Sequence, residues 1–320
     1  MSVTEGQVIS GVGARASFGP GVPGSGRARR RRYWWERSQS RWGLTLIAPS
    51  IVILFVFTIL PILGGLALSF TRFDLARPPQ WVGLANYVEI FSDDLFWRAA
   101  VNTLYFTAGT LIPGLALALS LALIATRRVP GVGIFRTIFY LPGLSSSIAV
   151  SVLWLYLFST DGLVNGVLHS VGIPRVGWFT DPAWAMPTII LNSLWIGAGG
   201  TMLVYIAGLN GIPQTYYEAA WMDGATRLQT FRYITLPLLQ PTTFLLFVTH
   251  MLGSFQVFAQ ILVMTEGGPA WSTTTIVHQI YINAFLKARF GYAGAQAVGL
   301  LLFLAGLTYL SFRSISSTAE

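Results

Sequence analysis

The sequence has no cysteine, a single lysine and little charge overall: 10% of its 320 residues are Asp, Glu, Lys or Arg. Without cysteine there is no disulfide framework, no thiolate nucleophile and no cysteine metal site. The lysine, Lys287, does not belong to a GxxxxGK[ST] segment, and the chain contains no such segment. Because that segment forms the phosphate cradle of many ATPases, we expect this chain to bind no ATP itself.

The chain is also poor in groups that could form a catalytic site. Its histidines, His169, His250 and His278, are scattered, and every Asp and Glu falls in a loop or a terminal segment. Metal ligation and acid–base catalysis need such groups close together. We therefore expect no enzyme, no catalytic residue, no metal and no bound cofactor. A proton-coupled carrier, the second hypothesis, is disfavoured because it usually needs carboxylates at mid-membrane depth.

Long apolar runs are what the sequence has in place of charge. Hydrophobic residues make up 53% of it and the mean hydropathy is +0.61. About 20 apolar residues cross a bilayer as a helix, and continuous runs favour helices over the alternating strands of a barrel. Six runs reach that length, approximately 44–70, 101–125, 135–158, 187–209, 242–264 and 293–312. The predicted fold class is an all-α integral membrane protein with six transmembrane helices.

The first forty residues differ from the rest in composition. They are rich in Gly and Arg and include RARRRRY at Arg27–Tyr33, so we expect residues 1–40 to form a disordered basic arm. Clustered arginine binds phosphate of any kind, and anionic lipid headgroups are nearer than nucleic acid. The first apolar run has full span length and follows arginines, which predicts a retained anchor rather than a cleaved signal peptide.

The distribution of basic residues predicts the orientation of the chain. With alternating spans and a cytoplasmic amino terminus, 14 of the 20 basic residues fall in inner segments. The remaining six fall in outer loops: Arg72, Arg77, Arg98, Arg175, Lys287 and Arg289. Because inner loops of membrane proteins carry an excess of Lys and Arg, both termini are predicted to be cytoplasmic.

One inner segment, at about 211–241 between the fourth and fifth runs, is too organised for a linker. Pro213 can open a helix, Gly224 permits a bend, and Pro237 breaks the stretch that follows. Two short helices joined near Gly224 are therefore predicted along the inner membrane face, with small residues exposed. Such a pair can dock another protein or simply pack against its own bundle.

The residue pattern of this segment resembles the EAA loop of the permeases of ABC importers. The resemblance is carried by Glu218-Ala219-Ala220, by Gly224, and by Ile-x-Leu-Pro at 234–237. It implies a type I ABC importer permease fold in which this loop is a cytoplasmic coupling helix seated in a cleft of the ATP-binding subunit. A mechanical role is thereby implied for Glu218, Ala219, Ala220, Asp223 and Gly224.

Other segments are similar to sugar-type permeases, and in particular to the maltose-type first permease: 81–107, TEGGP at 265–269, and 290–303. The large outer insertion of that type has no counterpart here, and the arginine arm matches nothing in the family. The resemblance implies a permease domain over 41–313 with a tail at 314–320, in a bacterial-type inner membrane. Its implied partners are a second permease, two ATP-binding subunits that use ATP and Mg, and an extracytoplasmic solute-binding protein.

Polar residues within the runs are candidates for the solute path. They are Asn192, Trp195, Thr201, Ser254 and Gln256. Amides and hydroxyls can pair with sugar hydroxyls and an indole can stack on a sugar ring, although simple helix packing is an open alternative. The resemblance implies a di- or oligosaccharide as cargo. Glycerol-3-phosphate or a glycerophosphodiester is the alternative, which the absence of an arginine cluster in the runs weakly disfavours.

Overall fold

The computed structural model describes residues 45–127 and 130–316. Residues 1–58 and 59–320 form two separate units. In the first unit the described residues, 45–58, are helical throughout. The predicted arm at 1–40 lies outside the described residues, and so does the end of the predicted tail at 317–320. Residues 314–316, which the sequence assigned to that tail, belong to the last helix.

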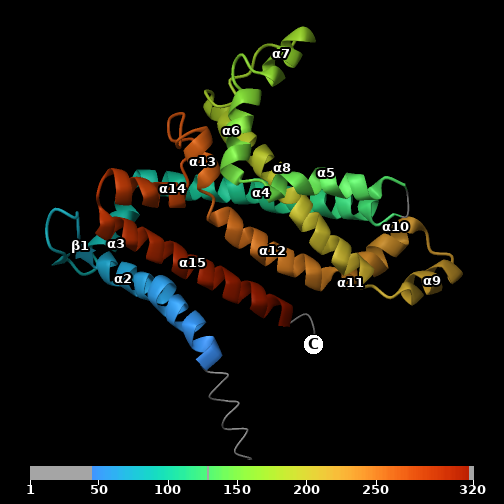
Figure 1. Ribbon diagram of the computed structural model, residues 1–320, viewed down its shortest axis with the longest axis horizontal. Coiled ribbons are helices and arrows are strands. Elements are labelled where there is room, and N and C mark those ends of the chain that lie inside the picture. The colour runs from blue at the N-terminus through green and yellow to red at the C-terminus, as the bar shows by residue number, and fades with distance from the viewer. Residues whose placement is uncertain (1–44, 128–129, 317–320) are drawn as a thin grey trace, which may run out of the picture. The chain divides into compact units, whose positions relative to one another are not determined.

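The second unit consists almost entirely of helices (Figure 1). The longer helices are α2 (Leu60–Ser69), α4 (Asp94–Ala125), α5 (Val132–Leu144), α6 (Ser147–Leu157), α8 (Pro182–Asn210), α12 (Gln240–Phe255) and α15 (Phe290–Ser316). The shorter helical elements are α3 (Ala85–Ser92), α7 (Leu163–Ser170), α9 (Gln214–Met222), α10 (Arg227–Thr230), η2 (Phe231–Thr235), α11 (Leu236–Leu238), α13 (Ala259–Met264), α14 (Ile276–Tyr281) and η3 (Ile282–Leu286). A two-stranded antiparallel ribbon pairs β1 (Thr71–Arg72) with β2 (Gln80–Trp81). A π-helical turn, η1 (Phe55–Ile59), precedes α2.

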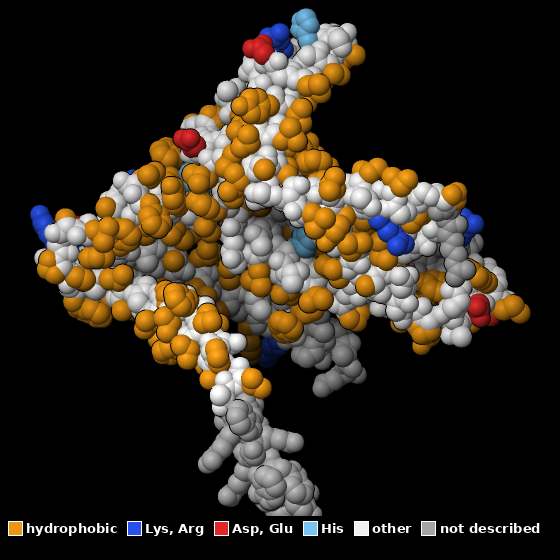
Figure 2. All heavy atoms as spheres, in the orientation of Figure 1, with side chains coloured by type: hydrophobic (Ala, Val, Ile, Leu, Met, Phe, Trp, Pro, Cys, Tyr) orange, Lys and Arg blue, Asp and Glu red, His pale blue; other side chains and the backbone are white. Residues whose placement is uncertain are grey.

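The described helices include four that are long and apolar enough to cross a membrane, or up to six if two bent pairs are each one span. The four are Thr45–Ser69, Asp94–Ala125, Pro182–Asn210 and Phe290–Arg313. In the bent pairs, α5 meets α6 at 100°, and the stretch Arg227–Leu238 meets α12 at 63°. Figure 2 shows hydrophobic side chains spread along these helices, with charged side chains mainly near helix ends and loops.

The third predicted span, 135–158, is broken rather than one helix. Ser145 and Ser146 have extended backbone, with ψ angles of 155° and 127°, and they separate α5 from α6. The Ser145 hydroxyl donates to the carbonyl of Leu141 at 3.3 Å. Serine hydroxyls compete in this way with the backbone hydrogen bonds of a helix. The average hydropathy of the segment does not predict the resulting break.

The fifth predicted span, 242–264, also contains a break. Helix α12 ends at Phe255, residues 256–258 are not helical, and α13 starts at Ala259. The last turn tightens, with Gln256 N donating to the carbonyl of Gly253 at 3.2 Å. The sequence did not predict this break because apolar residues continue through it, and it also did not predict the apolar helix Ile276–Leu286.

Two helices begin earlier than their apolar runs because acidic caps define their first turns. The Asp93 carboxylate accepts from the N–H groups of Leu95 and Phe96, at 2.9 and 3.3 Å, so that α4 begins at Asp94. The Asp181 carboxylate accepts from Ala183 N at 2.9 Å, and Pro182 occupies the first position of α8. Both helices therefore include the more polar residues that precede each apolar run.

The core lies where α4, α8 and α12 pack together, with α5 against α8 (Figure 1). Small residues, including Ala118, Ala122 and Ala198, are fully or almost fully buried there and allow close helix approach. The closest approach is at Gly199, where an added Cβ would lie 2.1 Å from the carbonyl oxygen of Phe139 on α5. Glycine at this position is therefore what permits α5 and α8 to touch.

Candidate coupling loop and solute groove

The coupling-loop candidate is built from α9 and α10, joined at Gly224 as the sequence predicted. Gly224 has a φ of +74°, and it donates to the carbonyl of Trp221 at 3.1 Å. Ala225 N donates to the carbonyl of Ala220 at 2.9 Å. These two bonds together form a Schellman motif, which ends a helix with a left-handed residue, usually glycine.

The second helix of the loop is fixed by a capping box. The Thr226 hydroxyl accepts from Gln229 N at 3.4 Å, and the Gln229 side chain accepts from Thr226 N at 2.7 Å. Two free backbone donors are thereby satisfied within the loop. The bend between the helices consequently has a defined geometry at both of its ends.

The predicted coupling residues are exposed with one exception. Glu218, Ala219, Asp223 and Gly224 lie at the surface. Ala220, with 8% exposure, faces inward and adds nothing to the expected small-residue surface. The structure instead adds large apolar side chains that the sequence analysis did not single out.

These additional exposed side chains are Trp221, Met222 and Leu228, of which Met222 is 89% exposed. Figure 2 shows hydrophobic side chains at the end of the molecule that carries α9. Exposed apolar residues beside charged ones are typical of a protein interaction surface. The spacing of these residues along the helices does not predict their exposure, because the same spacing occurs on a helix face that is buried.

A groove of about 660 Å³ lies between α4, α8 and α12 and extends to the helix break at 256–258. Its lining consists of Phe106, Thr110, Ser193, Ile196, Gly197, Thr249, His250, Gly253, Ser254, Gln256, Val257, Phe258, Ala259 and Gln260. Hydroxyl, amide and imidazole groups are its polar groups, and none of these side chains is an acid, a lysine or an arginine. The lining therefore suits a neutral ligand that both donates and accepts hydrogen bonds.

The helix break brings Gln256 to the groove. Gln256 ends α12 with φ and ψ of −100° and 13°, and its side chain is exposed. The neighbouring carbonyl of Val257 accepts from the Thr275 hydroxyl at 3.1 Å, so the irregular backbone is partly satisfied. Non-helical backbone at membrane depth is tolerated where it lines a cavity.

One wall of the groove is tied together by a histidine. His250 Nε2 lies 2.6 Å from the Thr201 Oγ1 on α8, and that hydroxyl also donates to the carbonyl of Gly197 at 3.0 Å. The Thr201 hydroxyl therefore contacts both the imidazole of His250 and a carbonyl of its own helix. The Ser254 hydroxyl donates to the His250 carbonyl. His250 thus both bonds to the neighbouring helix and lines the groove.

The predicted pathway residues are only partly brought together. Ser254 and Gln256 line the groove, and Thr201 reaches it through His250. Asn192 is fully buried, and neither polar atom of its side chain has a hydrogen-bond partner. Trp195 lies outside the lining, with its ring 5.9 Å from that of Trp154.

Residues 96–317 match the family described as "Binding-protein-dependent transport system inner membrane component". The chain belongs to this family. It is accordingly a membrane-embedded permease subunit of an ABC importer, a transport component rather than an enzyme.

Three relatives show the extent of the likeness. The permease is 36% identical to the probable ABC transporter permease protein YesP of Bacillus subtilis, over 88% of this chain and 92% of YesP. It is 35% identical to the lactose transport system permease protein LacF of Rhizobium radiobacter, over 84% and 92%. It is 33% identical to the sn-glycerol-3-phosphate transport system permease protein UgpA of Agrobacterium fabrum, over 84% and 93%.

A solved structure has the same fold. A chain of a bacterial alginate ABC transporter, crystallised in complex with an alginate pentasaccharide-bound periplasmic protein, superposes with a TM-score of 0.79 at 28% identity. The match covers 88% of this permease and 96% of that chain. The helical architecture described above is therefore one found in ABC importers.

Proposed function

We propose that this permease forms, with a second permease, the pathway by which a neutral carbohydrate enters the cell, most specifically a di- or oligosaccharide. The observation that carries the proposal is the groove of about 660 Å³, whose polar groups are hydroxyls, amides and one imidazole. Sugar hydroxyls pair with such groups, and the groove offers no fixed charge that a neutral sugar would leave unpaired. The relative LacF is named for lactose, which supports a neutral saccharide as cargo, whereas the alginate transporter supports a saccharide of the acidic kind.

Glycerol-3-phosphate or a glycerophosphodiester is the second candidate cargo. The likeness to UgpA supports it. A phosphate usually needs arginine or lysine contacts, and the groove lining of this chain includes neither. Such contacts would therefore have to come from the companion permease.

The proposed topology has six spans, of which the third joins α5 to α6 and the fifth joins α12 to α13, and both termini lie in the cytoplasm. The excess of basic residues in the predicted inner segments supports this orientation. It places α9 and α10 at the cytoplasmic face and the segment between α13 and α15 outside. This is the arrangement of a type I importer permease.

The proposed partners are a second permease, two cytoplasmic ATP-binding subunits that use ATP and Mg, and an extracytoplasmic solute-binding protein. The alginate transporter, which was crystallised with a periplasmic protein, supports the last of these. Glu218, Ala219, Asp223 and Gly224 of the coupling loop contact an ATP-binding subunit, with Ala220 supporting them from below. Closure of the ATP-binding subunits then moves the loop and opens the groove to the outside.

Co-purification tests the coupling loop. The permease is extracted from its native membrane in mild detergent, and the proteins that accompany it are identified by mass spectrometry. Wild type is expected to retain an ATP-binding subunit and a second permease, whereas Gly224→Asp loses the ATP-binding subunit. The matched control, Gly166→Asp, changes an exposed glycine of α7 that also has open space around it, and it should retain both partners. A lone chain in the wild-type sample contradicts the proposal.

Transport in proteoliposomes tests the cargo. The complete importer is supplied with its binding protein, and ATP hydrolysis is followed while di- and oligosaccharides or glycerol-3-phosphate are titrated. Gln256→Ala is expected to raise the saccharide concentration for half-maximal transport about fivefold, which corresponds to one lost hydrogen bond. Ser120→Ala, on the exposed face of α4, is the control. Stimulation by glycerol-3-phosphate alone would replace the saccharide assignment with the second candidate.

A further inference from the structure

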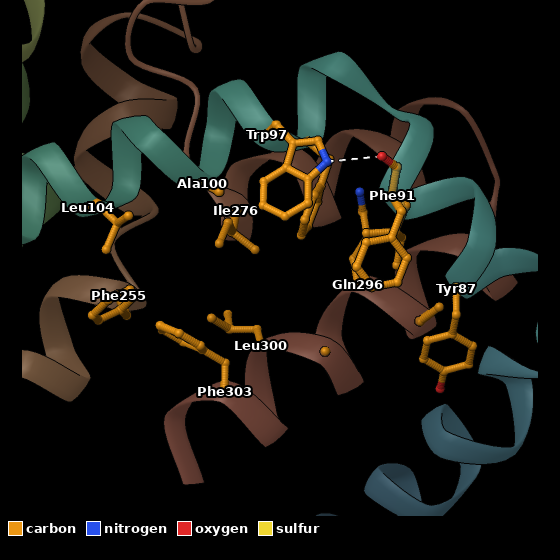
Figure 3. A pocket seen from close by; sticks show the side chains of 14 residues that line it. Tyr87, Phe91, Trp97, Ala100, Leu104, Phe255, Ile276, Gln296, Leu300 and Phe303 are labelled. Atoms are coloured by element: carbon orange, nitrogen blue, oxygen red, sulfur yellow. Dashed lines mark hydrogen bonds between the residues drawn. The ribbon is translucent and has the colours of Figure 1, made fainter. Parts of the chain in front are cut away.

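A second cavity, of about 420 Å³, lies between α3, α4 and α15 and shares no lining residue with the groove (Figure 3). Its walls are almost entirely apolar and include Phe91, Leu104, Leu300 and Phe303. Phe91, Leu104 and Phe303 are themselves exposed, so the cavity opens onto the outer surface of the helices. In a membrane protein that surface faces acyl chains or other membrane helices.

One polar atom in this cavity has no partner. Gln296, which is 1% exposed, has its Oε1 bonded to the Nδ2 of Asn283 at 3.0 Å, but its Nε2 has no hydrogen-bond partner. Figure 3 shows its side-chain nitrogen directed toward the space beside Phe91. An unpaired buried amide donor costs free energy, which predicts an acceptor supplied from outside the chain.

The other polar side chains of the lining are already satisfied. Trp97 Nε1 donates to the carbonyl of Phe91 at 3.1 Å, and the Tyr87 hydroxyl bonds to the Ser69 hydroxyl at 2.7 Å. An internal water normally needs two to four polar partners. The described lining offers one free partner, so a water molecule is poorly held, and an apolar ligand with one acceptor fits better.

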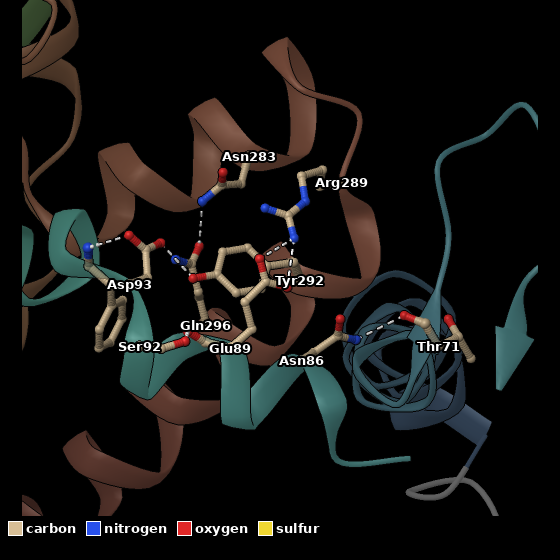
Figure 4. A network of polar contacts seen from close by, with 10 residues as sticks. Thr71, Asn86, Glu89, Ser92, Asp93, Asn283, Arg289, Tyr292 and Gln296 are labelled. Atoms are coloured by element: carbon tan, nitrogen blue, oxygen red, sulfur yellow. Dashed lines mark hydrogen bonds and ion pairs between the residues drawn. The ribbon is translucent and has the colours of Figure 1, made fainter. Parts of the chain in front are cut away.

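The depth of Gln296 agrees with a lipid. One turn before it on α15, the Tyr292 hydroxyl donates to Asp93 Oδ2 at 2.6 Å, and Arg289, which directly precedes α15, forms an ion pair with Glu89 at 2.6 Å (Figure 4). Charged groups of this kind mark the headgroup level. Four residues of helix rise about 6 Å, and the polar layer on each face of a bilayer is about 5–7 Å thick. Gln296 therefore lies at the base of this layer, where the glycerol esters of phospholipids are found.

We propose that this cavity binds one acyl chain of a glycerophospholipid and that Gln296 Nε2 donates a hydrogen bond to the ester carbonyl of that chain. A transmembrane helix of a partner subunit is a poorer occupant, because its backbone carbonyls already accept hydrogen bonds within the helix. The acyl chain brings both the apolar surface and the free acceptor that the cavity lacks.

Photolabelling of the intact importer tests this site. The complex is reconstituted in bilayers of phosphatidylethanolamine and phosphatidylglycerol that contain a trace of phosphatidylethanolamine with a diazirine on one acyl chain. Mass spectrometry then locates the labelled residues, which are expected to include Phe91, Leu104 or Phe303. Absence of label from all three in the intact complex, as when a partner helix covers the cavity, overturns the proposal.

A pair of glycine substitutions provides the matched control. Gly299 lines the cavity and Gly306 does not, and a Cβ at either position meets nothing within 4 Å. Gly299→Leu should fill the cavity and abolish labelling there, whereas Gly306→Leu should leave it unchanged. Equal labelling in both variants would show that lipid coats the surface without entering the cavity, and would refute the site.

The hydrogen bond has its own test. In wild type, a diester probe should label the cavity about fivefold more than a diether probe, which lacks the carbonyl but keeps the chains. Gln296→Leu should remove this preference while it retains the labelled positions. If that variant does not assemble, the comparison of the diester and diether probes in wild type is by itself the test of the hydrogen bond. Equal labelling by both probes overturns the proposed role of Gln296.

Discussion

His250 Nε2 and Thr201 Oγ1, 2.6 Å apart, join α12 to α8 at the wall of the proposed solute groove. The two residues are 49 positions apart in the sequence. Their bond fixes both the orientation of the imidazole and the spacing of the two helices.

Thr201→Val should weaken this wall. Valine has nearly the same shape but no hydroxyl, so His250 loses its partner at a cost of about 1 kcal/mol. A lower unfolding temperature in detergent and altered transport kinetics are expected. Thr308→Val is the control, since the Thr308 hydroxyl donates to the carbonyl of Leu304 in its own helix and does not line the groove. Equal effects of the two variants would assign no special role to the link between helices.

Gly224→Ala should disturb the coupling loop through its backbone alone. A Cβ at this position meets nothing within 4 Å, but a φ of +74° costs a non-glycine residue about 1–2 kcal/mol. Gly224→Asn should be milder, because asparagine adopts this conformation more readily. The measurement is the number of ATP molecules hydrolysed per solute transported, which should rise in the order wild type, Asn, Ala. An alanine variant with wild-type coupling would contradict the role of the Schellman motif.

Gly199→Ala should be strongly destabilising. Its Cβ would lie 2.1 Å from the carbonyl oxygen of Phe139, and the overpacking should cost roughly 1–3 kcal/mol or more. Gly200→Ala, one residue later, introduces the same atom where nothing lies within 4 Å. Thermal unfolding of the two variants should therefore differ clearly, with Gly200→Ala close to wild type. Similar stability of both would mean that α5 and α8 are not in close contact.

His278, on the short apolar helix before α15, should make the protein less stable in acid. Burial lowers the pKa of His278 from its usual 6.5, while the charge of Glu266 acts in the opposite direction. The unfolded chain then binds the proton more readily, so this contribution is present above pH 6.5 and is lost as the pH falls below it. The unfolding temperature measured between about pH 5 and 8 should show the loss.

His278→Gln should flatten this pH profile. The control is His169→Gln, which replaces an exposed histidine of α7 and should keep the wild-type profile. A profile unchanged in the His278 variant would assign the acid sensitivity to another group.

Apolar runs in the sequence predicted the helical class and the approximate positions of the four unbroken candidate spans among the described residues. They did not predict the breaks at Ser145–Ser146 and at 256–258, because the apolar run resumes after each break. Nor did they predict that the helices start at Asp94 and Pro182, because the N-cap residues Asp93 and Asp181 determine these starts. Local hydrogen bonding sets these features, and it depends on backbone geometry that composition does not encode.

The two short helices of the proposed coupling loop were predictable from sequence because their pattern is local: helix formers, a glycine that permits a bend, and a second helical stretch follow one another within a few residues. The groove was harder to predict, since its walls come from helices distant in sequence. Asn192 and Trp195 are polar and lie on α8, but only the packing of the helices shows that neither lines the groove. Ser254 and Gln256 were identified as polar residues within an apolar run, and they line the groove because they adjoin the helix break.

The coupling loop is the chain segment that links α8 to α12, the two helices joined by Thr201 and His250. Because α5 touches α8 at Gly199, a displacement applied to the loop reaches three helices through two short connections. In the proposed importer, its effect on the groove is a change in the distance between opposing walls, so that the stiffness of a single bend would limit how much mechanical work ATP-binding subunits deliver to the solute.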